Sequence, residues 1–334
     1  MSANGVAEKF DLAGALAEIE RQFGDGAVRE IGSGANEAVE AIPTGAASLD
    51  QALGIGGVAR GRVIEVFGPE SSGKTTLTYH LIAEAQRLGG RCAVIDAEHS
   101  LDPGYAREIG VELESLLLCQ PDNGEQALQI VDLLVRSGEL ALVVVDSVAA
   151  LVPRAELEGT MEDHQVGLQA RMMSKGLRKL AGHLSETGTT CLFTNQLREK
   201  VGVVYGPRET QPGGRALKFF ASQRLDLRRI ETLKEGERAV GIMVRAKVVK
   251  NKVASPFGLA EFEIDFGKGI SKVGSLLDLA VERGVVKRSG AFYAFGEEKL
   301  GRGRAQVKGV LEERPDLAEG ISEGLGLGSS RTNI

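Results

Sequence analysis

The sequence predicts an α/β protein with a mostly parallel sheet flanked by helices. Between residues 62 and 194, short apolar runs rich in Val, Ile and Leu alternate with amphipathic stretches. That alternation is typical of βαβ units, whose strands lie parallel. Between residues 224 and 266, three segments alternate with a period near two and have short connections. We therefore expect an antiparallel extension of the same sheet.

Composition is that of a globular protein without a membrane span. The chain has 334 residues, of which 43% are hydrophobic and 26% charged, enough for a full α/β core with small appendages. No apolar run reaches the roughly 20 residues that a spanning helix needs. Residues 1–10 lack the charged-then-apolar pattern of a signal peptide, so we expect a cytoplasmic protein with no membrane partner.

The cysteines and histidines indicate neither disulfides nor a metal centre. Cys92, Cys119 and Cys191 each lie in a strand-like stretch, and the chain has no C-x-x-C pair. The four histidines show no metal-ligand spacing. We therefore expect three reduced, buried thiols.

Charge is distributed unevenly along a chain whose net charge is −6. Residues 224–252 and 268–308 each hold nine Lys or Arg against four Asp or Glu, whereas the first forty residues hold three against eight. Such asymmetry is a common sign of a polyanion site on an acidic protein. Charge alone equally allows a solvated basic surface.

The N-terminal segment predicts a helix outside the core. Asp11 is a candidate N-cap, and apolar residues then recur at helical spacing up to Phe23. The Gly-rich stretch over residues 23–35 is typical of a linker. A tethered helix packs either on its own domain or on a neighbouring subunit, and the sequence leaves both open.

The most specific motif is a phosphate-binding loop at residues 68–75, between an apolar strand and an amphipathic helix. In that context G-x-x-x-x-G-K-T predicts nucleoside triphosphate binding, which a chance Gly/Ser-rich turn does not. Gly68 and Gly73 let backbone N–H groups converge on an anion. Lys74 can reach the β- and γ-phosphates, and the Thr75 hydroxyl can ligate Mg²⁺. The expected ATP-binding residues of this loop are Gly68, Pro69, Glu70, Ser71, Ser72, Gly73, Lys74, Thr75 and Thr76.

The remaining elements follow from the same periodicities. Parallel strands are expected over 92–96, 116–119, 141–146 and 190–194, and helices over 103–109, 125–135 and 166–186. Antiparallel strands are expected over 224–230, 240–250 and 260–266, followed by a helix over 276–283, a hairpin-like stretch over 291–295 and a second helix. We divide the chain into an N-terminal helix and linker (1–35), a core (36–269), a small second domain (270–323) and a disordered tail (324–334).

Carboxylates follow two of the expected strands. Ligands of open α/β sheets bind outside the carboxyl ends of the strands, where Asp146, Asp96 and Glu98 are expected. Asp146 is a candidate for the Mg²⁺ shell, directly or through water, although it could also be a strand-terminal polar residue without that role. Asp96 or Glu98 could be a general base for water, and their spacing favours neither.

Gln196 follows another strand and could contact the γ-phosphate, as switch elements do, or could simply begin a loop. The stretch over residues 197–214 is rich in Gly, Pro and charge. A loop of that length in a compact domain is usually functional or disordered.

Seven segments of the chain read GPESSGKTT, VIDAEHSLDP, LVVVDSVAALVPRAELEG, GLQARMMSKGLRKL, FTNQLREKVGVVYG, GGRALKFFAS and VVKNKVASPF. Together they resemble the bacterial RecA recombinase family. Their order and spacing are preserved from about residue 8 to about residue 315. The resemblance implies a RecA-type P-loop ATPase core, between an N-terminal oligomerisation helix and a small α+β C-terminal domain that gathers DNA.

The resemblance implies roles around the nucleotide. Glu98 would activate the attacking water, and Gln196 would sense the γ-phosphate. Asp102 and Tyr105 match positions near the adenine, where the Tyr105 ring could stack. Phe266 stands where the family usually has tyrosine, also at the base.

The resemblance also implies roles across a subunit interface. Lys250 and Lys252 would reach the neighbour's γ-phosphate, and Phe219 would link one subunit's sensor loop to the next ATP. Without the resemblance, the two lysines would be interpreted as edge-strand protection.

Two stretches, 158–167 and 197–214, match the family's loops that face the DNA axis. The DNA-binding positions implied are Val166, Arg171, Arg178, Arg198, Tyr205, Gly213 and Gly214. Val166 is smaller than the familiar apolar residue and would be a smaller wedge between base triplets, and Tyr205 replaces a phenylalanine-like position. The family's tail is often acidic and competes with DNA, whereas this one ends in GSSRTNI, so that brake is not expected.

The phosphate loop and the resemblance together predict a DNA-dependent ATPase. The resemblance implies that it forms helical filaments on single-stranded DNA and exchanges strands with homologous double-stranded DNA in recombinational repair. By resemblance it would also activate self-cleavage of a LexA-type repressor. Three alternatives are a hexameric helicase, a small-molecule phosphotransferase and an ATP-gated scaffold with negligible turnover. No acceptor-pocket insertion lies near the phosphate loop, which disfavours the phosphotransferase, and Glu98 disfavours the scaffold.

Overall fold

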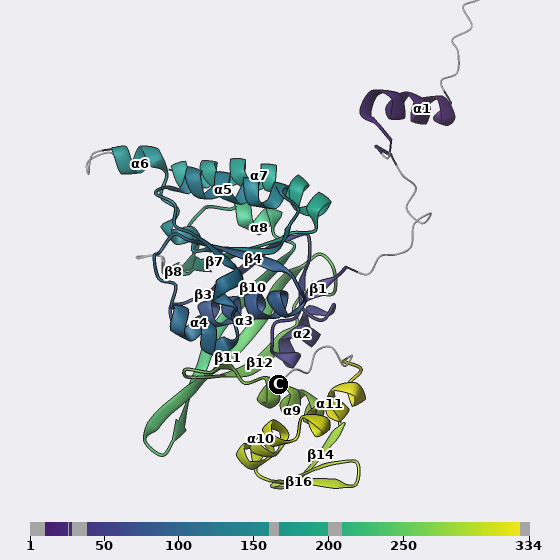
Figure 1. Ribbon diagram of the computed structural model, residues 1–334, viewed down its shortest axis with the longest axis vertical. Coiled ribbons are helices and arrows are strands. Elements are labelled where there is room, and N and C mark those ends of the chain that lie inside the picture. The colour runs from purple at the N-terminus through teal and green to yellow at the C-terminus, as the bar shows by residue number, and fades with distance from the viewer. Residues whose placement is uncertain (1–10, 26, 29–38, 160–166, 200–208, 328–334) are drawn as a thin grey trace, which may run out of the picture. The chain divides into compact units, whose positions relative to one another are not determined.

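The computed structural model describes residues 11–25, 27–28, 39–159, 167–199 and 209–327 (Figure 1). Its contacts divide the chain into two units, residues 1–38 and residues 39–334. In the first unit, helix α1 (Leu12–Phe23) begins where the sequence predicts, because Asp11 Oδ1 accepts a hydrogen bond from the Gly14 N–H at 2.7 Å. None of the residues of α1 is buried.

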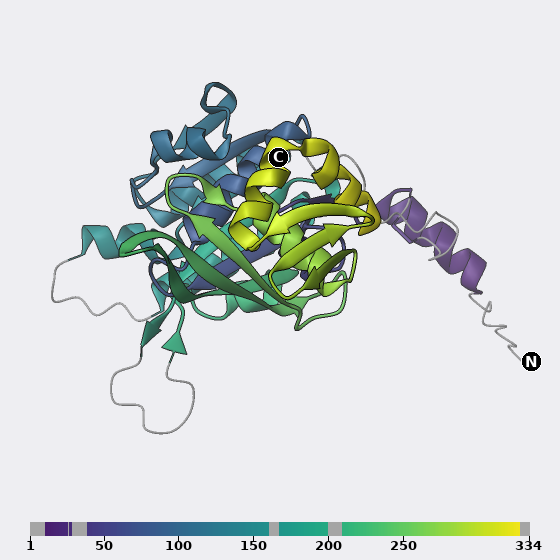
Figure 2. The ribbon, with the colours of Figure 1, turned by 90° about the horizontal axis from the view of Figure 1, so that it is seen from below.

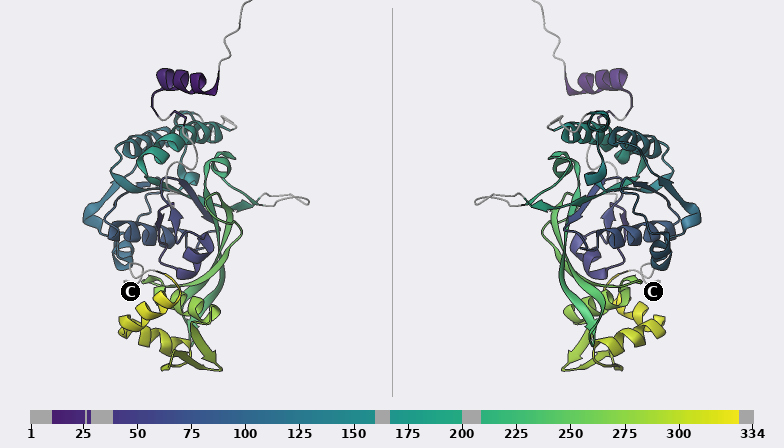
Figure 3. Two further views of the ribbon diagram at one scale, coloured as in Figure 1. Left: turned by 90° about the vertical axis from the view of Figure 1, so that its right-hand side faces the viewer. Right: turned by 90° about the vertical axis from the view of Figure 1, so that its left-hand side faces the viewer.

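A nine-stranded sheet organises the described part of the second unit (Figures 1 and 3). Its order is β13-β12-β11-β10-β3-β7-β6-β4-β5. The strands are β3 (Val63–Gly68), β4 (Arg91–Asp96), β5 (Leu116–Cys119), β6 (Leu140–Asp146), β7 (Thr190–Gln196), β10 (Gln223–Glu235), β11 (Arg238–Asn251), β12 (Leu259–Asp265) and β13 (Gly269–Ile270). From β5 to β10 neighbouring strands are parallel, and from β10 to β13 they are antiparallel. Both parts of the predicted sheet are therefore confirmed.

Helices cover the two faces of this sheet, with α5 and α7 on one face and α3 on the other (Figure 1). The helices and 3₁₀ turns of the core are α2 (Ala47–Leu53), α3 (Lys74–Arg87), α4 (Pro103–Ile109), η1 (Leu113–Ser115), α5 (Gly124–Arg136), η2 (Val148–Ala150), α6 (Arg154–Glu158), α7 (Leu168–Thr187) and α8 (Ala216–Phe220). The Asn123 side chain caps α5 by accepting from the Gln126 N–H at 2.9 Å. The predicted alternation of strands and helices thus holds from β3 to β7.

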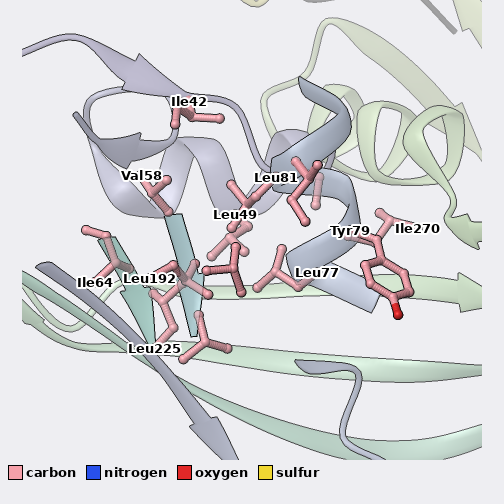
Figure 4. Close-up of a cluster of buried hydrophobic side chains, with 14 of the residues drawn as sticks. Ile42, Leu49, Val58, Ile64, Leu77, Tyr79, Leu81, Leu192, Leu225 and Ile270 are labelled. Atoms are coloured by element: carbon pink, nitrogen blue, oxygen red, sulfur yellow. The ribbon is translucent and has the colours of Figure 1, made fainter. Parts of the chain in front are cut away.

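Successive residues of the parallel strands pack into two different cores, because strand side chains alternate between faces. Cys92 and Val94 of β4 join the core beneath α3, whereas Ala93 and Ile95 join the core beneath α5 and α7. Figure 4 shows the first core, in which side chains of α3 face the sheet. Its labelled members are Ile42, Leu49, Val58, Ile64, Leu77, Tyr79, Leu81, Leu192, Leu225 and Ile270.

Two strands run further than the periodicity predicts. β7 continues to Gln196 because Asn195 and Gln196 pair with Phe67 and Gly68 of β3. β10 continues to Glu235 because it pairs with β11 along its length. Two short ribbons complete the core, β1 (Ala41–Ile42) with β2 (Val58–Ala59), and β8 (Arg198–Glu199) with β9 (Glu209–Thr210).

The C-terminal elements have a small hydrophobic core of their own and lie at one end of the second unit (Figures 1 and 3). They are α9 (Lys272–Glu282), β14 (Val286–Ser289), β15 (Phe292–Phe295), β16 (Glu298–Arg302), α10 (Arg304–Glu313) and α11 (Pro315–Gly324). The stretch expected as a hairpin is the middle strand of a three-stranded antiparallel sheet. Ion pairs join this part to β12, as Arg304 bonds Glu263, and Lys308 bonds Glu263 at 2.8 Å.

The prediction of a disordered tail starting at residue 324 is wrong at its beginning. Helix α11 includes Gly324, and the Leu327 N–H donates to the Ser322 carbonyl at 3.0 Å. Leu325 and Leu327 pack against the C-terminal core, and that burial is the reason these residues keep a defined place. Residues 328–334 lie outside the described part of the chain.

The prediction of buried thiols is confirmed for two of the three cysteines and is wrong for Cys119. Cys92 and Cys191 are buried, and Cys119 is half-buried on the edge strand β5; all three are free thiols. Burial raises the pKa of Cys92 to about 12 and raises the pKa of Cys191 as well. Among the described residues, no helix has the length and apolar character needed to cross a bilayer.

Candidate functional site

The carboxyl ends of four neighbouring strands bring polar residues to one edge of the sheet. Gly68 at the end of β3 pairs with Gln196 at the end of β7, and Asp96 at the end of β4 pairs with Asp146 at the end of β6. Since β7 also pairs with β6, these ends form a continuous row. The sequence predicted this edge, and the register confirms it.

The phosphate loop connects β3 to α3 at this edge. Gly68 ends β3, the residues from Pro69 to Gly73 form the turn, and Lys74, Thr75 and Thr76 begin α3. A Cβ on Gly68 would lie 2.2 Å from the Leu227 carbonyl oxygen, so the backbone passes too close to β10 for any side chain.

The groups of the loop suit an anion. Lys74 Nζ donates to the carbonyls of Gly68 at 3.2 Å and Pro69 at 2.7 Å. Burial lowers the pKa of Lys74, against the opposing charges of Asp146, Glu98 and Glu70. The Ser72 hydroxyl is buried without a hydrogen-bond partner in the described part of the chain, and phosphate oxygens are acceptors that could satisfy it. The residues present therefore fit a nucleoside triphosphate.

Asp146 is held at the end of β6 by a neighbour that the sequence analysis missed. Thr194 Oγ1 of β7 donates to Asp146 Oδ1 at 2.5 Å. Burial raises the pKa of Asp146, although the Thr194 bond acts in the opposite direction. Carboxylate repulsion from Glu98 and Asp96 adds to the rise, and a divalent cation would relieve it.

No group of three or more His, Cys, Asp or Glu that could hold a metal occurs among the described residues. Mg²⁺ in nucleotide sites is usually bound by one or two protein oxygens together with phosphates and waters. Asp146 at the end of β6 and Thr75 in the first turn of α3 offer a donor set of that kind. These residues fit Mg²⁺ bound with a nucleotide.

Glu98 and Asp96, which the sequence left undecided, have different surroundings. The buried Asp96 carboxylate accepts from the Ser100 N–H at 3.1 Å, the Leu101 N–H at 3.3 Å and Gln120 Nε2 at 3.2 Å. These bonds hold the turn that follows β4. The exposed Glu98 lies within that turn, so Asp96 supports the segment on which Glu98 stands.

One oxygen of Glu98 is bonded to the neighbouring strands. Its Oε1 accepts from the Ser147 hydroxyl, just after β6, and from Gln196 Nε2 of β7 at 3.3 Å. The structure thus brings together Glu98 and Gln196, which the sequence analysis named separately. Ser147 went unnoticed, although it directly follows the candidate Asp146 in the sequence.

Two of the three residues expected near an adenine lie at the start of α4. Asp102 caps α4 by accepting from the Tyr105 N–H at 3.0 Å. Tyr105 Oη bonds Thr76 Oγ1 at 2.9 Å, which ties its ring to the start of α3. Burial raises the pKa of Tyr105, whereas the Thr76 bond lowers it.

Phe266, in the turn after β12, is 53% exposed. This turn leads into β13, which reaches α4, because a Cβ on Gly269 would lie 2.9 Å from Ile109 Cγ1. Phe266 is therefore carried on a segment that approaches the helix of Tyr105.

Lys250, Lys252 and Phe219 form one patch. Lys250 Nζ donates to the carbonyls of Lys218 at 2.6 Å and Phe219 at 3.0 Å, and Lys252 Nζ donates to Phe219 at 3.4 Å. Burial, then the charges of Lys252 and Arg224, lower the pKa of Lys250. The Phe219 side chain is 69% exposed. The resemblance that points to these residues does not indicate that they touch.

The candidate DNA positions lie on three segments. Arg171 and Arg178 are exposed on α7, and Arg198 is exposed on β8, in the short ribbon that stands out from the sheet (Figure 2). Gly213 and Gly214 precede α8 and have φ of +81° and +74°. Val166 and Tyr205 lie outside the described residues.

A buried ion pair fixes the second end of the 197–214 loop. Glu65 of β3 is fully buried and bonds Arg224 of β10. Arg224 Nη2 donates to Gln211 Oε1 at 3.0 Å, and Asn195 Nδ2 donates both to Glu65 Oε1 and to the Pro212 carbonyl, each at 3.2 Å. Sequence reasoning missed this network. The signal was present, because a carboxylate inside the apolar run VIEVF requires a buried partner.

A phosphate loop after a central strand, with carboxylates at the ends of adjacent parallel strands, defines a P-loop ATPase. The model of the RecA N-terminal domain matches residues 10–271, and that of the RecA C-terminal domain matches residues 274–325. The chain therefore belongs to the RecA family of ATP-hydrolysing enzymes, which act in DNA recombination and repair.

Curated relatives agree with this assignment. The chain is 59% identical to "Protein RecA" of Streptomyces coelicolor over 96% of its length and 85% of the relative. It is 59% identical to "Protein RecA" of Rubrobacter xylanophilus (94% and 92%) and 61% identical to that of Leifsonia xyli (93% and 87%). A solved structure titled "Crystal structure of the RadB recombinase" is similar in fold, with a TM-score of 0.53 and 24% identity over 69% of this chain and 98% of the other.

Proposed function

We propose that this chain is a DNA-dependent ATPase that assembles as a helical filament on single-stranded DNA and exchanges strands with a homologous duplex. The observation that carries the proposal is the meeting of Lys74, Asp146, Glu98 and Gln196 at one edge of the sheet. These groups could hold a triphosphate, orient a water and register whether the γ-phosphate is present.

The chain's own residues would bind and align the nucleotide. Backbone N–H groups of residues 68–75 and Lys74 would hold the phosphates, and the Tyr105 ring, with Asp102 and Phe266, would contact the base. Thr75 and Asp146 would hold Mg²⁺, whose charge would stabilise the β- and γ-phosphates. Catalysis in phosphoryl transfer is largely positioning and charge stabilisation.

Glu98 is the proposed general base. Its exposed carboxylate has an oxygen bonded to Gln196, whereas both Asp96 oxygens accept hydrogen bonds, from the turn after β4 and from Gln120 after β5. A base needs a lone pair directed at water, which favours Glu98. Gln196 would move between this carboxylate and a γ-phosphate and so act as the sensor.

Lys250 and Lys252 are proposed to act on the ATP of a neighbouring subunit. In the register of the sheet, Lys250 of β11 lies opposite Arg224 of β10. Arg224 in turn lies opposite Glu65, in the middle of β3. β11 runs antiparallel to β10 and therefore leads toward the amino end of β3, away from Gly68. Because the lysines lie away from their own phosphate loop, action in trans is the simpler proposal.

The DNA path is proposed along α7 and the loop ends. Exposed Arg171, Arg178 and Arg198, with the backbone at Gly213 and Gly214, would contact phosphates, and base pairing would test homology. Val166 and Tyr205, which lie outside the described residues, are proposed to contact DNA from family membership alone.

Assembly and regulation complete the proposal. We divide the chain into an oligomerisation helix with its linker (1–35), an ATPase core (36–269) and a DNA-gathering domain (270–323). The uncovered helix α1 would pack on a neighbouring subunit. Activation of a LexA-type repressor is proposed from family membership alone.

ATPase assays with and without single-stranded DNA test the proposal. We expect turnover to rise when DNA is added, and electron microscopy of the nucleotide-loaded protein to show helical filaments. A hexameric helicase would give closed rings and directional unwinding instead. Turnover that does not rise when DNA is added, together with particles that stay monomeric, would contradict the proposal.

A further inference from the structure

Both described ends of the loop over residues 197–214 are connected to the Glu98 carboxylate. At the first end, Gln196 bonds Glu98 directly. At the second end, the Gly213 N–H donates to Gln169 Oε1 at 2.9 Å. The second connection continues through the start of α7, and neither motif nor periodicity indicates it.

Gln169 uses all of its amide hydrogen-bonding groups to join two segments. Its Oε1 accepts from Gly213, and its Nε2 donates to the carbonyls of Val148 at 2.8 Å and Leu151 at 3.1 Å. An amide NH₂ has two donors, so both are engaged. The side chain thus holds the end of the loop against η2, which follows β6.

Close packing accompanies these bonds. Gly213 has φ of +81°, and a Cβ at this position would lie 2.7 Å from Val148 Cγ1. Val148 is fully buried. The Gly213 backbone therefore rests directly on Val148, and a shift of either segment is felt by the other.

Val148 directly follows Ser147, whose hydroxyl donates to Glu98 Oε1. Gln196 donates to the same oxygen. A carboxylate oxygen has two lone pairs, and these two donors occupy both. For this oxygen to accept a hydrogen bond from an attacking water, Ser147 or Gln196 must move.

We propose that Gln169 is a positioning residue that couples the Gly213 end of the loop to the Ser147–Glu98 hydrogen bond. DNA held at this end would shift η2 through Gln169 and Val148, withdraw Ser147 and free Oε1 of Glu98 to accept a hydrogen bond from water. The inference rests on the proposed DNA-dependent hydrolysis, and it adds a route to Glu98 separate from that of Gln196.

The first test replaces Gln169 by leucine, which keeps the size of the side chain and removes its hydrogen bonds. We expect the ratio of DNA-stimulated to DNA-free turnover to fall by about tenfold, within the roughly 5–150-fold range of coupling between sites. The DNA-free rate should stay nearly unchanged, because Gln169 bonds neither Glu98 nor the phosphate loop. Affinity for single-stranded DNA, measured separately by anisotropy, should be kept. The matched control is Gln129→Leu, at an exposed glutamine of α5, and it should keep the full ratio.

A second test asks whether Gln169 acts through Ser147. Ser147→Ala should also lower the ratio, and the double variant Gln169→Leu/Ser147→Ala should lose no more than the worse single variant. Independent sites would instead multiply their effects. If Gln169→Leu does not fold, Gln169→Glu serves in its place, because it keeps an acceptor for Gly213 and sets an oxygen against the carbonyls of Val148 and Leu151.

The outcomes separate this inference from the function on which it rests. An unsubstituted protein that DNA does not stimulate would overturn both. A stimulated protein whose Gln169→Leu variant is stimulated equally, or whose double variant shows multiplied losses, would overturn the inference alone. A parallel loss of DNA-free turnover and thermal stability would show a merely structural role for Gln169 and would overturn it too.

Discussion

Three partly buried cations in this chain are held in two opposite ways. Lys74 and Lys250 donate to backbone carbonyls, burial lowers the pKa of both, and within the described ranges neither forms an ion pair. Arg304 is bonded to carboxylates instead. Burial alone would lower the pKa of Arg304, but its bonds to Asp278 and Glu263 raise it.

This difference in hydrogen-bond partners indicates different roles: catalysis for the cations bonded to carbonyls, and fold stability for the cation bonded to carboxylates. A partly buried ammonium that meets only carbonyl dipoles remains under-compensated, and a phosphate would complete its surroundings. A guanidinium bonded to carboxylates is already satisfied and stabilises the seam between α10 and β12. We therefore expect substitutions of the first kind of cation to change turnover, and those of the second kind to change stability.

The largest expected effect lies at the lysine patch. Lys250→Ala/Lys252→Ala should lower DNA-stimulated turnover by roughly 10³–10⁵-fold, the general scale of a residue that stabilises charge in trans. Mixing this variant with Glu98→Gln should restore part of the activity, because some interfaces then join an intact Glu98 to intact lysines. ATPase titrations of the mixture measure this recovery.

The matched control for the patch is Lys247→Ala, at an exposed position of the same strand, which should keep its turnover. If mixed filaments form and no activity returns at any ratio, the action in trans is wrong. Lys250 would then belong with the architectural cations.

The next effect separates the two carboxylates after β4. Glu98→Gln should lower turnover by roughly 10²–10⁴-fold through loss of the base while ATP still binds, whereas Lys74→Ala should lose ATP binding. Asp96→Asn should chiefly loosen the turn that carries Glu98, so we expect a lower melting temperature with it. Single-turnover hydrolysis and nucleotide binding, measured side by side, test these assignments, and near-normal turnover of Glu98→Gln would return Asp96 as the base.

The seam gives a smaller effect, on stability. Arg304→Gln leaves buried Glu263 with fewer donors, and we expect a loss of about 1–3 kcal/mol in the free energy of unfolding. The exposed Arg302→Gln is the control and should change it by less than about 0.5 kcal/mol. Chemical denaturation measures both, and DNA-free turnover of Arg304→Gln should be unchanged if the comparison holds.

The seam also predicts a pH dependence. Burial would raise the pKa of Glu263, but bonds from Arg304 and Lys308 bring it below its ordinary value of 4.5. A lowered folded-state pKa stabilises the fold above that ordinary value, and the contribution is lost as the pH falls through the folded-state pKa. The stability difference between the protein and Glu263→Gln should therefore be constant from pH 7 to about 4.5 and shrink below it. A difference that grows on acidification would contradict the ion-pair account.

The smallest effect concerns exposed arginines, which belong to neither kind of partly buried cation. Arg171→Ala and Arg178→Ala should each make the slope of log K against log salt shallower, by about 0.7 for every phosphate of single-stranded DNA that the arginine neutralises. Binding isotherms between about 50 and 200 mM salt test this. A slope identical to that of the unsubstituted protein would remove the residue from the DNA path.

What the sequence predicts well is local. The phosphate loop, the Asp11 cap and the apolar run of β6 are each recognisable within a few residues, and the structure has them where expected. The carboxyl edge was also predictable, because parallel strands place their ends together.

What the sequence did not predict depends on contacts between distant segments. The choice between Asp96 and Glu98 rests in part on Gln120, which is brought beside Asp96 by the pairing of β5 with β4. The basic count over residues 268–308 could not show that Arg304 and Lys308 are used in ion pairs with β12. The extent of the tail was misjudged because the packing of Leu325 and Leu327 is likewise non-local.

The unequal burial of the three thiols has a practical consequence for fluorescence work. Maleimide reagents attack the thiolate, and Cys92 and Cys191 are both buried and hard to ionise. Half-buried Cys119 should therefore take a dye first without any engineered cysteine. It pairs with Ile95 and precedes Gln120, the partner of Asp96, so an environment-sensitive label there would follow nucleotide occupancy from the edge of the sheet in an otherwise unaltered protein.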